Sequence, residues 1–484
     1  MTRRTDTFLS AAMLISASFA LAAPDLHAEI IVQRFSVDGG LDPDPLTLPE
    51  VLVTEDGIVR IRQPYNPAML PDYYIYTTLP DEDITGVELD IDPEGPFVNR
   101  DVSVMLRNPY NPDAFAARNV GYVRLGDMDD PEKTVRKSRL KASRISGSMG
   151  DVSVVPDLQW SHPGDRYGTV EIFVGGDVTG DWKAWEPISS GNPGDGVWIA
   201  GDVSGNINFM GTPPADDPNN PSVSGKELHI NGSITETGSV HAACNFVGTD
   251  QNPVIIGGDL VGTFSTDGHL VTFLNVQGQL GGSILINRGI SRSGAVNIQN
   301  GVADTGLIQC TNISDPLGAP GGFINITGDM RGTIHVTNRV AGHITLHQVA
   351  GSVIIDDRLN DTGYISFLSL SPTKDNQAPA TIVLNDNCSA GSAAWLGSII
   401  HNGVVLAPGY YVDDLSLGGG SIEPLGMQPV CPGDLNGDKR VDQADLGILL
   451  AAYETSCRGD MNGDKKTDQT DLGILLAAYG YICP

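Results

Sequence analysis

Short runs in which apolar and polar residues alternate fill the middle of the chain, from about residue 145 to residue 422. Segments such as residues 323–327 and 332–336 place an apolar side chain at every second position, which is the period of a β-strand with one buried face. Gly, Asn, Asp and Ser separate the runs. We therefore expect a mainly β protein built from many short strands and turns.

A unit of the form Gly-Asp-apolar-x-Gly recurs among these runs. It occupies residues 176–180, 201–205, 258–262 and 328–332, and looser copies start at Gly232 and Gly278. One such unit cannot bury its apolar face alone, whereas stacked copies form a continuous core, and glycine at the corners allows left-handed backbone. The repeat favours a right-handed parallel β-helix-like solenoid over residues 145–422, although a β-sandwich with many turns has a similar texture.

The remaining segments complete a modular plan. Residues 1–28 have the arginines, apolar stretch and small residues of a signal peptide, with cleavage after Ala22 or Ala28, which predicts a secreted or cell-surface protein. Residues 29–144, rich in Pro and Asp, are expected to form a β-rich N-terminal cap region. Residues 423–432 are expected to be a linker before a separate module at 433–484. No other apolar run is long enough for a membrane span.

The chain is strongly acidic, with 59 Asp and Glu against 29 Lys and Arg and a formal net charge of -30. Such a surface repels the phosphates of nucleic acid, so we expect no nucleic-acid partner. The same surface attracts calcium.

Two twelve-residue loops, residues 434–445 and 460–471, lie near the C-terminus. Each carries oxygen-bearing side chains at loop positions 1, 3, 5, 9 and 12. Calcium takes roughly six to eight oxygen ligands, which such loops supply. The sequence therefore predicts two Ca²⁺ sites. The expected ligands are Asp434, Asn436, Asp438, the Arg440 carbonyl, Asp442 and Asp445 in the first loop, and Asp460, Asn462, Asp464, the Lys466 carbonyl, Asp468 and Asp471 in the second.

The same apolar helical pattern follows each loop, over residues 446–453 and 472–479, and no helical pattern precedes either loop. This duplicated loop-helix unit resembles a type I dockerin over about residues 431–484. The resemblance implies a small two-site calcium fold, EF-hand-like in its loops, which forms on metal binding and docks onto a cohesin-like domain. It also implies which residues meet the partner, namely Gln443, Ala444, Gln469 and Thr470 with the exposed helix faces.

Two further features of this module concern its calcium affinity and its cysteines. Lys439 and Lys465 stand at loop position 6, where such loops normally have Gly, so we expect weaker calcium binding. Three of the six cysteines, Cys431, Cys457 and Cys483, lie in the module. If the module brings its ends together, Cys431 and Cys483 form the favoured bridge, but sequence alone does not decide the pairing.

The solenoid offers weaker chemical signals. The repeated Asp177, Asp202, Asp259 and Asp329 either cap turn amides, which we favour, or form a calcium-binding ladder. Trp182, Trp185 and Trp198 are expected in local packing rather than on a sugar, and His335, His343 and His347 on a solvent face.

Two functions remain. The first is a secreted calcium-binding protein that docks through its C-terminal module and carries a non-catalytic or glycan-binding solenoid, with polysaccharide as a second candidate partner. The alternative is a polysaccharide lyase or glycoside hydrolase on a β-helix, whose catalytic residues the sequence does not identify.

Overall fold

The computed structural model describes the parts of the chain that carry regular structure. These are residues 29–36, 50–63, 71–79, 81–91, 102–111, 113–126, 138–154, 169–184, 187–188, 196–209, 222–224, 228–247, 253–313, 321–356, 359, 363–370, 380–384, 398–406, 411–414, 417, 420–424, 433–435, 440–454, 459, 461 and 466–482. The chain divides into two compact units, Met1–Gly232 with Thr237–Ala243, and Ser233–Glu236 with Cys244–Pro484.

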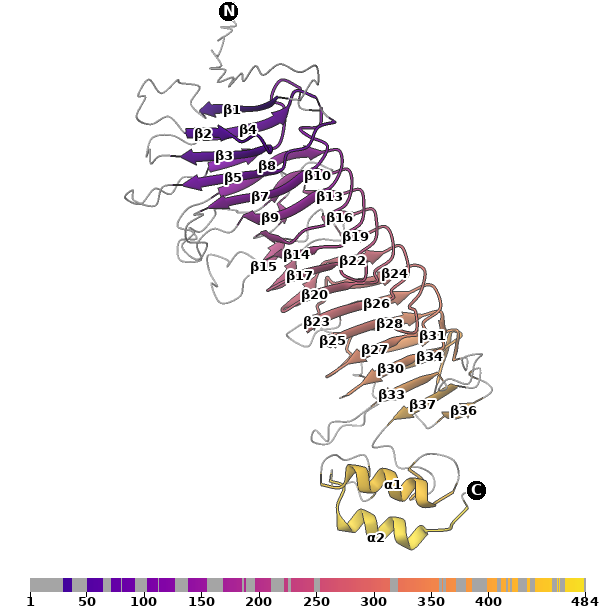
Figure 1. The fold of residues 1–484 in the computed structure, drawn as a ribbon. Coiled ribbons are helices and arrows are strands. Elements are labelled where there is room, and N and C mark those ends of the chain that lie inside the picture. The colour runs from indigo at the N-terminus through magenta and orange to yellow at the C-terminus, as the bar shows by residue number, and fades with distance from the viewer. Residues whose placement is uncertain are drawn as a thin grey trace, which may run out of the picture. The chain divides into compact units, whose positions relative to one another are not determined.

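The first unit stacks its strands into two mainly parallel sheets, which we call sheet A and sheet B (Figure 1). The chain passes repeatedly from one sheet to the other, with a few consecutive strands in the same sheet. Sheet A contains β1 (Ile30–Ser36), β4 (Pro71–Thr77), β6 (Val102–Met105), β8 (Ser138–Ile145), β10 (Thr169–Val174), β12 (Pro187–Ile188), β13 (Val197–Ile199) and β16 (Leu228–Ile230). Sheet B contains β2 (Glu50–Val53), β3 (Ile58–Gln63), β5 (Gly86–Ile91), β7 (Val120–Gly126), β9 (Met149–Val154), β11 (Trp182–Ala184), β14 (Asn206–Phe209), β15 (Ser222–Ser224) and β17 (Ser239–Ala242).

The second unit repeats this alternation. Its strands in sheet A are β19 (Val254–Ile256), β22 (Phe273–Val276), β24 (Ala295–Ile298), β26 (Phe323–Ile326), β28 (His343–Leu346), β31 (Tyr364–Phe367), β34 (Ser398–His401) and β35 (Val404–Val405). Its strands in sheet B are β18 (Asn245–Val247), β20 (Thr263–Thr266), β21 (His269–Val271), β23 (Ser283–Ile290), β25 (Leu307–Ile313), β27 (Thr333–Val336), β30 (Ser352–Ile355), β33 (Thr381–Leu384), β36 (Tyr411–Asp414) and β37 (Gly420–Pro424). A small third sheet pairs β29 (Gln348–Val349) with β32 (Ser369–Leu370).

The core lies between the two sheets and follows the alternation seen in the sequence. In β26, for example, Ile324 and Ile326 are buried while Phe323 and Asn325 are partly exposed, and the same pattern recurs in most described strands. Each buried aliphatic side chain contributes roughly 1.5–3 kcal/mol through removal of apolar surface from water. Parallel pairing is what stacked coils produce, whereas sandwiches are antiparallel, so the architecture agrees with the predicted solenoid-like β fold.

The solenoid does not keep to its expected ends. Strand β8 (Ser138–Ile145) crosses the predicted boundary between residues 144 and 145, and pairs in parallel with both β6 and β10. Parallel pairing already begins at β3 and β5, so the described strands before residue 145 belong to the same stacked sheets. At the other end, β37 pairs with β33 through Pro424, two residues past the predicted end at 422.

The glycines of the repeated unit have a different reason from the one expected. None of them lies in the left-handed region. In three of the four copies the neighbouring coil comes too close for a side chain, at Gly176, Gly180, Gly201, Gly205, Gly328 and Gly332. A Cβ on Gly205 would lie 2.0 Å from the carbonyl oxygen of Gly180, and one on Gly282 would lie 2.0 Å from that of Gly262. The central apolar residues of the units pair as single bridges, as in Val178 with Val203 and Leu260 with Leu280. The unit is thus a tight stacking corner.

Two helices complete the second unit's described elements, α1 (Gln443–Ala452) and α2 (Gln469–Ala478), and they contact each other. They overlap the segments expected to be helical, residues 446–453 and 472–479, but each begins three residues earlier, inside the predicted loop. Among the described residues, no helix has the length and apolar content needed to cross a membrane.

Candidate metal centre and docking surface

Helix α1 begins at a capping box made by two of the predicted calcium ligands. Asp442 stands at the N-cap, where its Oδ1 accepts a hydrogen bond from the Ala444 N–H at 2.8 Å. Asp445, one turn later, accepts from the Asp442 N–H at 2.8 Å through Oδ2 and from the Leu435 N–H at 2.7 Å through Oδ1. Its carboxylate therefore ties the beginning of the loop to the beginning of the helix.

Helix α2 repeats this arrangement. Asp468 Oδ1 accepts from the Thr470 N–H at 2.7 Å, and this hydrogen bond is the main cause of the lowered pKa of Asp468. Asp471 accepts from the Asp468 N–H at 2.9 Å and from the Met461 N–H at 2.7 Å. The two halves of the module therefore use the same hydrogen bonds at equivalent positions, which agrees with the duplication in the sequence.

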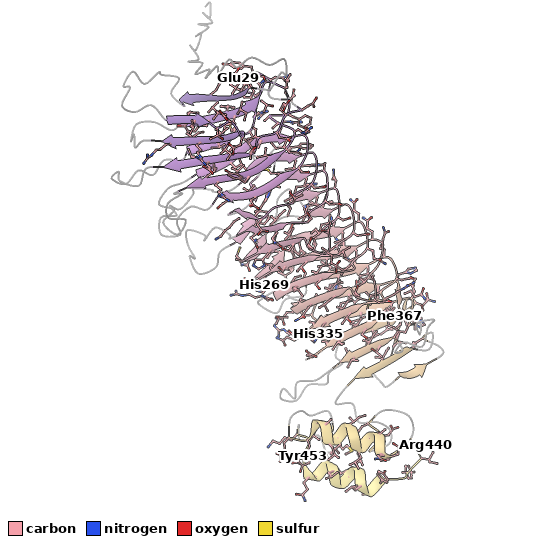
Figure 2. The ribbon with its side chains drawn as sticks, viewed as in Figure 1. Glu29, His269, His335, Phe367, Arg440 and Tyr453 are labelled. Atoms are coloured by element: carbon pink, nitrogen blue, oxygen red, sulfur yellow. The ribbon has the colours of Figure 1, made fainter. Side chains whose placement is uncertain are left out.

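A small hydrophobic core joins the halves. Val441, Leu449, Met461 and Leu475 are buried together, with Leu435, Leu446, Tyr453, Leu472, Ile474 and Ala478 packed around them. The core draws on both loops and both helices, so neither half can bury its apolar face without the other. The end of the chain also returns to the first loop, because Arg440 pairs with Ile482 in an isolated antiparallel bridge (Arg440 and Tyr453 are labelled in Figure 2).

Three of the predicted ligands that the structure describes are buried carboxylates. Asp445 and Asp471 have 0% exposed surface and Asp434 has 5%. Burying a carboxylate is costly unless hydrogen bonds or a cation compensate its charge, and the two N–H donors found at Asp445 and at Asp471 do so in part. Oxygen-only donors in a tight loop are the ligand set that Ca²⁺ prefers, so these residues fit that ion.

Not every predicted ligand can be placed. Asn436, Asp438, Asp460, Asn462 and Asp464, together with Lys439 and Lys465 of loop position 6, lie outside the described residues. Arg440 and Lys466, expected to contribute only their carbonyls, both have exposed side chains. Within the described part of the chain, no group of three or more His, Cys, Asp or Glu side chains is arranged to hold a metal ion.

The residues predicted to meet a partner lie on the surface. Gln443 and Ala444 in the first turn of α1, and Gln469 and Thr470 in the first turn of α2, are all exposed. Each helix also exposes a leucine at the equivalent position, Leu450 at 55% and Leu476 at 54%.

On each helix, a glycine lies between the residues predicted to meet a partner and the exposed leucine, so no side chain projects from the surface at that point. A Cβ added to Gly447 or to Gly473 would meet nothing within 4 Å. Spacings of three residues place Ala444, Gly447 and Leu450 within an arc of about 120° on the surface of α1, and Thr470, Gly473 and Leu476 within the same arc on α2. The two helices therefore present matching, largely uncharged strips to the solvent.

The cysteines are only partly described. Cys431, Cys457 and Cys483 lie outside the described residues, as does Cys388, so the predicted bridge stays a prediction. Cys244 and Cys310 are both buried. Cys310 is a free thiol, and burial raises its pKa to about 12. A thiol with so high a pKa is not a nucleophile near neutral pH.

The aspartates of the repeated unit act as caps between coils. Oδ1 of Asp177 accepts from the Asp202 N–H at 2.8 Å, and Oδ1 of Asp259 accepts from the Gln279 N–H at 2.7 Å. These contacts favour the capping role over the calcium ladder. Asp329 differs, since its carboxylate pairs with Arg331 at 3.7 Å.

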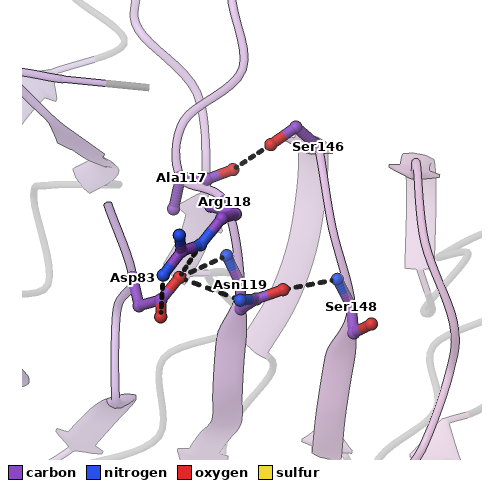
Figure 3. Close-up of polar contacts among 6 residues, drawn as sticks. All are labelled: Asp83, Ala117, Arg118, Asn119, Ser146 and Ser148. Atoms are coloured by element: carbon purple, nitrogen blue, oxygen red, sulfur yellow. Dashed lines mark hydrogen bonds and ion pairs between the residues drawn. The ribbon is translucent and has the colours of Figure 1, made fainter. Parts of the chain in front are cut away.

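The same capping continues toward the N-terminus with other residue types, as Figure 3 shows. Oδ1 of Asp83 accepts from the Asn119 N–H at 3.1 Å, and Oδ1 of Asn119 accepts from the Ser148 N–H at 2.8 Å. Arg118 also donates two hydrogen bonds to Asp83, both at 2.9 Å, and lowers the pKa of that carboxyl. Because Asp, Asn and Ser share this role, the Gly-Asp motif reveals only some of the caps.

The tryptophans and histidines of the solenoid take part in packing. Trp182 is fully buried and its indole N–H donates to the Gly150 carbonyl at 3.0 Å, while Trp198 stacks on His229 with ring centroids 4.6 Å apart. Trp185 lies outside the described residues. His335 and His343 are partly exposed and His347 is exposed, as expected.

Two of these histidines have partners that the sequence did not indicate. Nε2 of His335 lies 2.7 Å from Oδ2 of Asp356 (His335 is labelled in Figure 2). The His343 ring stacks on Tyr364 with centroids 3.9 Å apart, and desolvation lowers its pKa. Register between coils of unequal length creates both contacts, so no local motif could have revealed them.

No family model, curated protein or solved structure matches the chain.

Proposed function

We propose that this chain is an exported, calcium-dependent docking protein. Its C-terminal module, residues 433–484, binds two Ca²⁺ ions and docks onto a cohesin-type domain. The stacked sheets form a right-handed β-helix, the hand usual for parallel strands joined by crossovers, and serve as a non-catalytic body carried by the module. Export follows from the signal-peptide pattern of residues 1–28, which lie outside the described part of the chain.

The observation that carries this proposal is the matched burial of Asp445 and Asp471. Both carboxylates close a twelve-residue loop, have no exposed surface, and hold that loop's second backbone N–H. A pair of buried charges in equivalent positions is expensive to maintain for packing alone. A divalent cation in each loop offsets that cost, and the remaining loop residues supply the further oxygens that calcium needs.

Two matching helix surfaces support docking as the role of the module. The partner-facing residues Gln443, Ala444, Gln469 and Thr470 are exposed, and the glycine and leucine that follow on each helix extend an uncharged strip. The exposed leucines Leu450 and Leu476, at equivalent positions of the two helices, are the apolar side chains that such a partner would cover. The proposed partner is therefore a protein domain with a largely apolar face.

Isothermal titration calorimetry of the full chain with CaCl₂ tests the metal part. We expect two ions per chain for the wild type, and none in the double variant Asp445→Asn with Asp471→Asn, which keeps side-chain shape but removes the closing carboxylates. The matched control, Asp177→Asn with Asp202→Asn, should keep both ions. Absence of binding up to millimolar calcium would overturn the proposal. Loss of calcium binding in the control would indicate that the ions bind to the solenoid instead.

The docking part is tested by immobilising a type I cohesin domain and passing the chain over it with calcium or with EGTA. Retention that needs calcium and disappears when Leu450 and Leu476 are both changed to Asp supports docking. Cleavage of a polysaccharide by the purified chain would instead show that the solenoid is catalytic. It would support the alternative function, a lyase or glycoside hydrolase.

A further inference from the structure

The outer face of sheet A in the second unit carries a regular array of side chains that the docking function does not use. Strands β22, β24, β26, β28 and β31 pair in parallel without a slip, so equivalent positions line up from coil to coil. One row of outward-facing residues consists of Asn275, Asn297, Asn325, Thr345 and Ser366. All five are partly exposed.

The amides of this row are held in one orientation. Nδ2 of Asn297 donates to Oδ1 of Asn275, and Nδ2 of Asn325 donates to Oδ1 of Asn297, each at 2.7 Å. A primary amide has two N–H donors and an acceptor oxygen with two lone pairs, so each linked amide keeps hydrogen-bonding capacity for a ligand. Because the chain of amides is preoriented, little side-chain entropy is lost when a ligand binds.

Hydroxyl groups extend the array along the same face. Thr345 and Ser366 continue the row of amides, and their hydroxyls make no hydrogen bond to any described residue. Tyr364, two positions before Ser366 on β31, likewise has a hydroxyl without a partner among the described residues. Hydroxyls both donate and accept, as amides also can, so the face suits a ligand with the same mixed capacity.

A second row, two positions earlier on the strands, adds aromatic rings. Phe323, His343 and Tyr364 follow one another on adjacent strands, with ring centroids 5.0 Å apart for the first pair and 3.9 Å for the second. Their mutual contacts fix the rings in place. The row supplies a rigid apolar border beside the amides, which favours ligands with both C–H and O–H surface.

The array contains no charged side chain, although the chain as a whole has a net charge of -30. Calcium favours carboxylates and anionic ligands favour Arg or Lys, so neither of these ligand classes suits the face. Adjacent strands lie about 4.8 Å apart, close to the length of one hexose unit in an extended glycan. We propose that this face binds a neutral polysaccharide chain, which runs across the strands with successive sugars over successive coils.

This inference rests on the proposal that the solenoid is a non-catalytic body, but it does not depend on calcium. The test is retention of the full-length protein on three insoluble neutral polysaccharides: microcrystalline cellulose, xylan and mannan. Polygalacturonate serves as the anionic comparison, and every experiment is repeated with EGTA. We expect retention on at least one neutral polysaccharide, unchanged by EGTA, so that failure of docking and failure of glycan binding give different results.

The variants test the face itself. Asn297→Ala with Asn325→Ala should weaken retention about tenfold, because two hydrogen-bonding groups are lost. Ser366→Glu, at a side chain without a described hydrogen bond, should also weaken it while leaving the amide chain intact. The matched control lies on the outer face of sheet B, where Thr333→Ala with Ser352→Ala removes two hydroxyls and should have no effect.

Thermal unfolding must show that each variant is folded. No retention on any of the three neutral polysaccharides would overturn the inference. Retention on polygalacturonate alone, or equal retention of wild type and both sheet A variants, would overturn it as well.

Discussion

The Oδ1 atom of Asp177 accepts a hydrogen bond from the backbone N–H of Asp202, which lies 25 residues further along the chain and 2.8 Å away. This contact joins one coil to the next at a corner where the β-ladder is reduced to a single bridge between Val178 and Val203. The side chain thus replaces a hydrogen bond that strand pairing does not supply at the corner.

We therefore expect Asp177→Ala to lower the free energy of unfolding of the first unit by about 1 kcal/mol, the usual contribution of such a hydrogen bond. Asp177→Asn keeps the accepting oxygen, so its free energy of unfolding should stay within a few tenths of a kcal/mol of the wild-type value. Urea denaturation with and without CaCl₂ measures both. Calcium-dependent stability that disappears in Asp177→Asn would contradict the capping role and favour a metal ladder.

Neighbouring glycines at 281 and 282 provide the sharpest test of the stacking corner. A Cβ on Gly282 would lie 2.0 Å from the carbonyl oxygen of Gly262, whereas one on Gly281 would meet nothing within 4 Å. Gly282→Ala should lower the free energy of unfolding by about 1–3 kcal/mol, because the backbone must move to make room for the added Cβ. Gly281→Ala should be neutral or stabilise slightly, since it lowers the entropy of the unfolded chain. Thermal unfolding compares the two, and equal effects would show that backbone contact does not explain the motif.

Acid should weaken the first unit through Asp83. Two hydrogen bonds from Arg118 lower the pKa of this carboxyl below its ordinary 3.8. A lowered folded-state pKa means that the contribution to stability is complete above about pH 4 and is lost as the pH falls through the folded value. The difference in unfolding midpoint between the wild type and Asp83→Asn should therefore be largest near neutral pH and vanish at strongly acidic pH. A constant difference across the titration would contradict this account.

Calcium should stabilise the C-terminal module through each closing aspartate. Asp471→Asn removes one charge from a fully buried position and also replaces an oxygen that accepts from the Asp468 N–H. In calcium, the variant should bind one ion fewer and lose about 1 kcal/mol or more from the capping box alone. In EGTA, the variant should differ from the wild type only by the stability that is lost with the capping box. Calorimetry and protease resistance of the module measure the two effects, and an unchanged calcium stoichiometry would argue against Asp471 as a ligand.

The periodicity of the sequence was sufficient to indicate strands, their buried faces and the stacked-coil architecture. Alternation at every second residue determines which side chains can face a core, as Ile324 and Ile326 do in β26, and the repeated unit shows that coils succeed one another. The duplicated loops similarly indicated two equivalent halves, which the structure shows in the matching hydrogen bonds of Asp445 and Asp471.

Only the tertiary structure decided which residues become neighbours between coils. Ser239 meets Asn206 across 33 residues, while Asn287 meets Asp267 across 20, so no single repeat length relates a side chain to its partner. The pairing of His335 with Asp356 and the chain of amides from Asn275 to Asn325 arise from this register. A local pattern specifies the face on which a residue lies, but the lengths of all the intervening turns determine what it meets there.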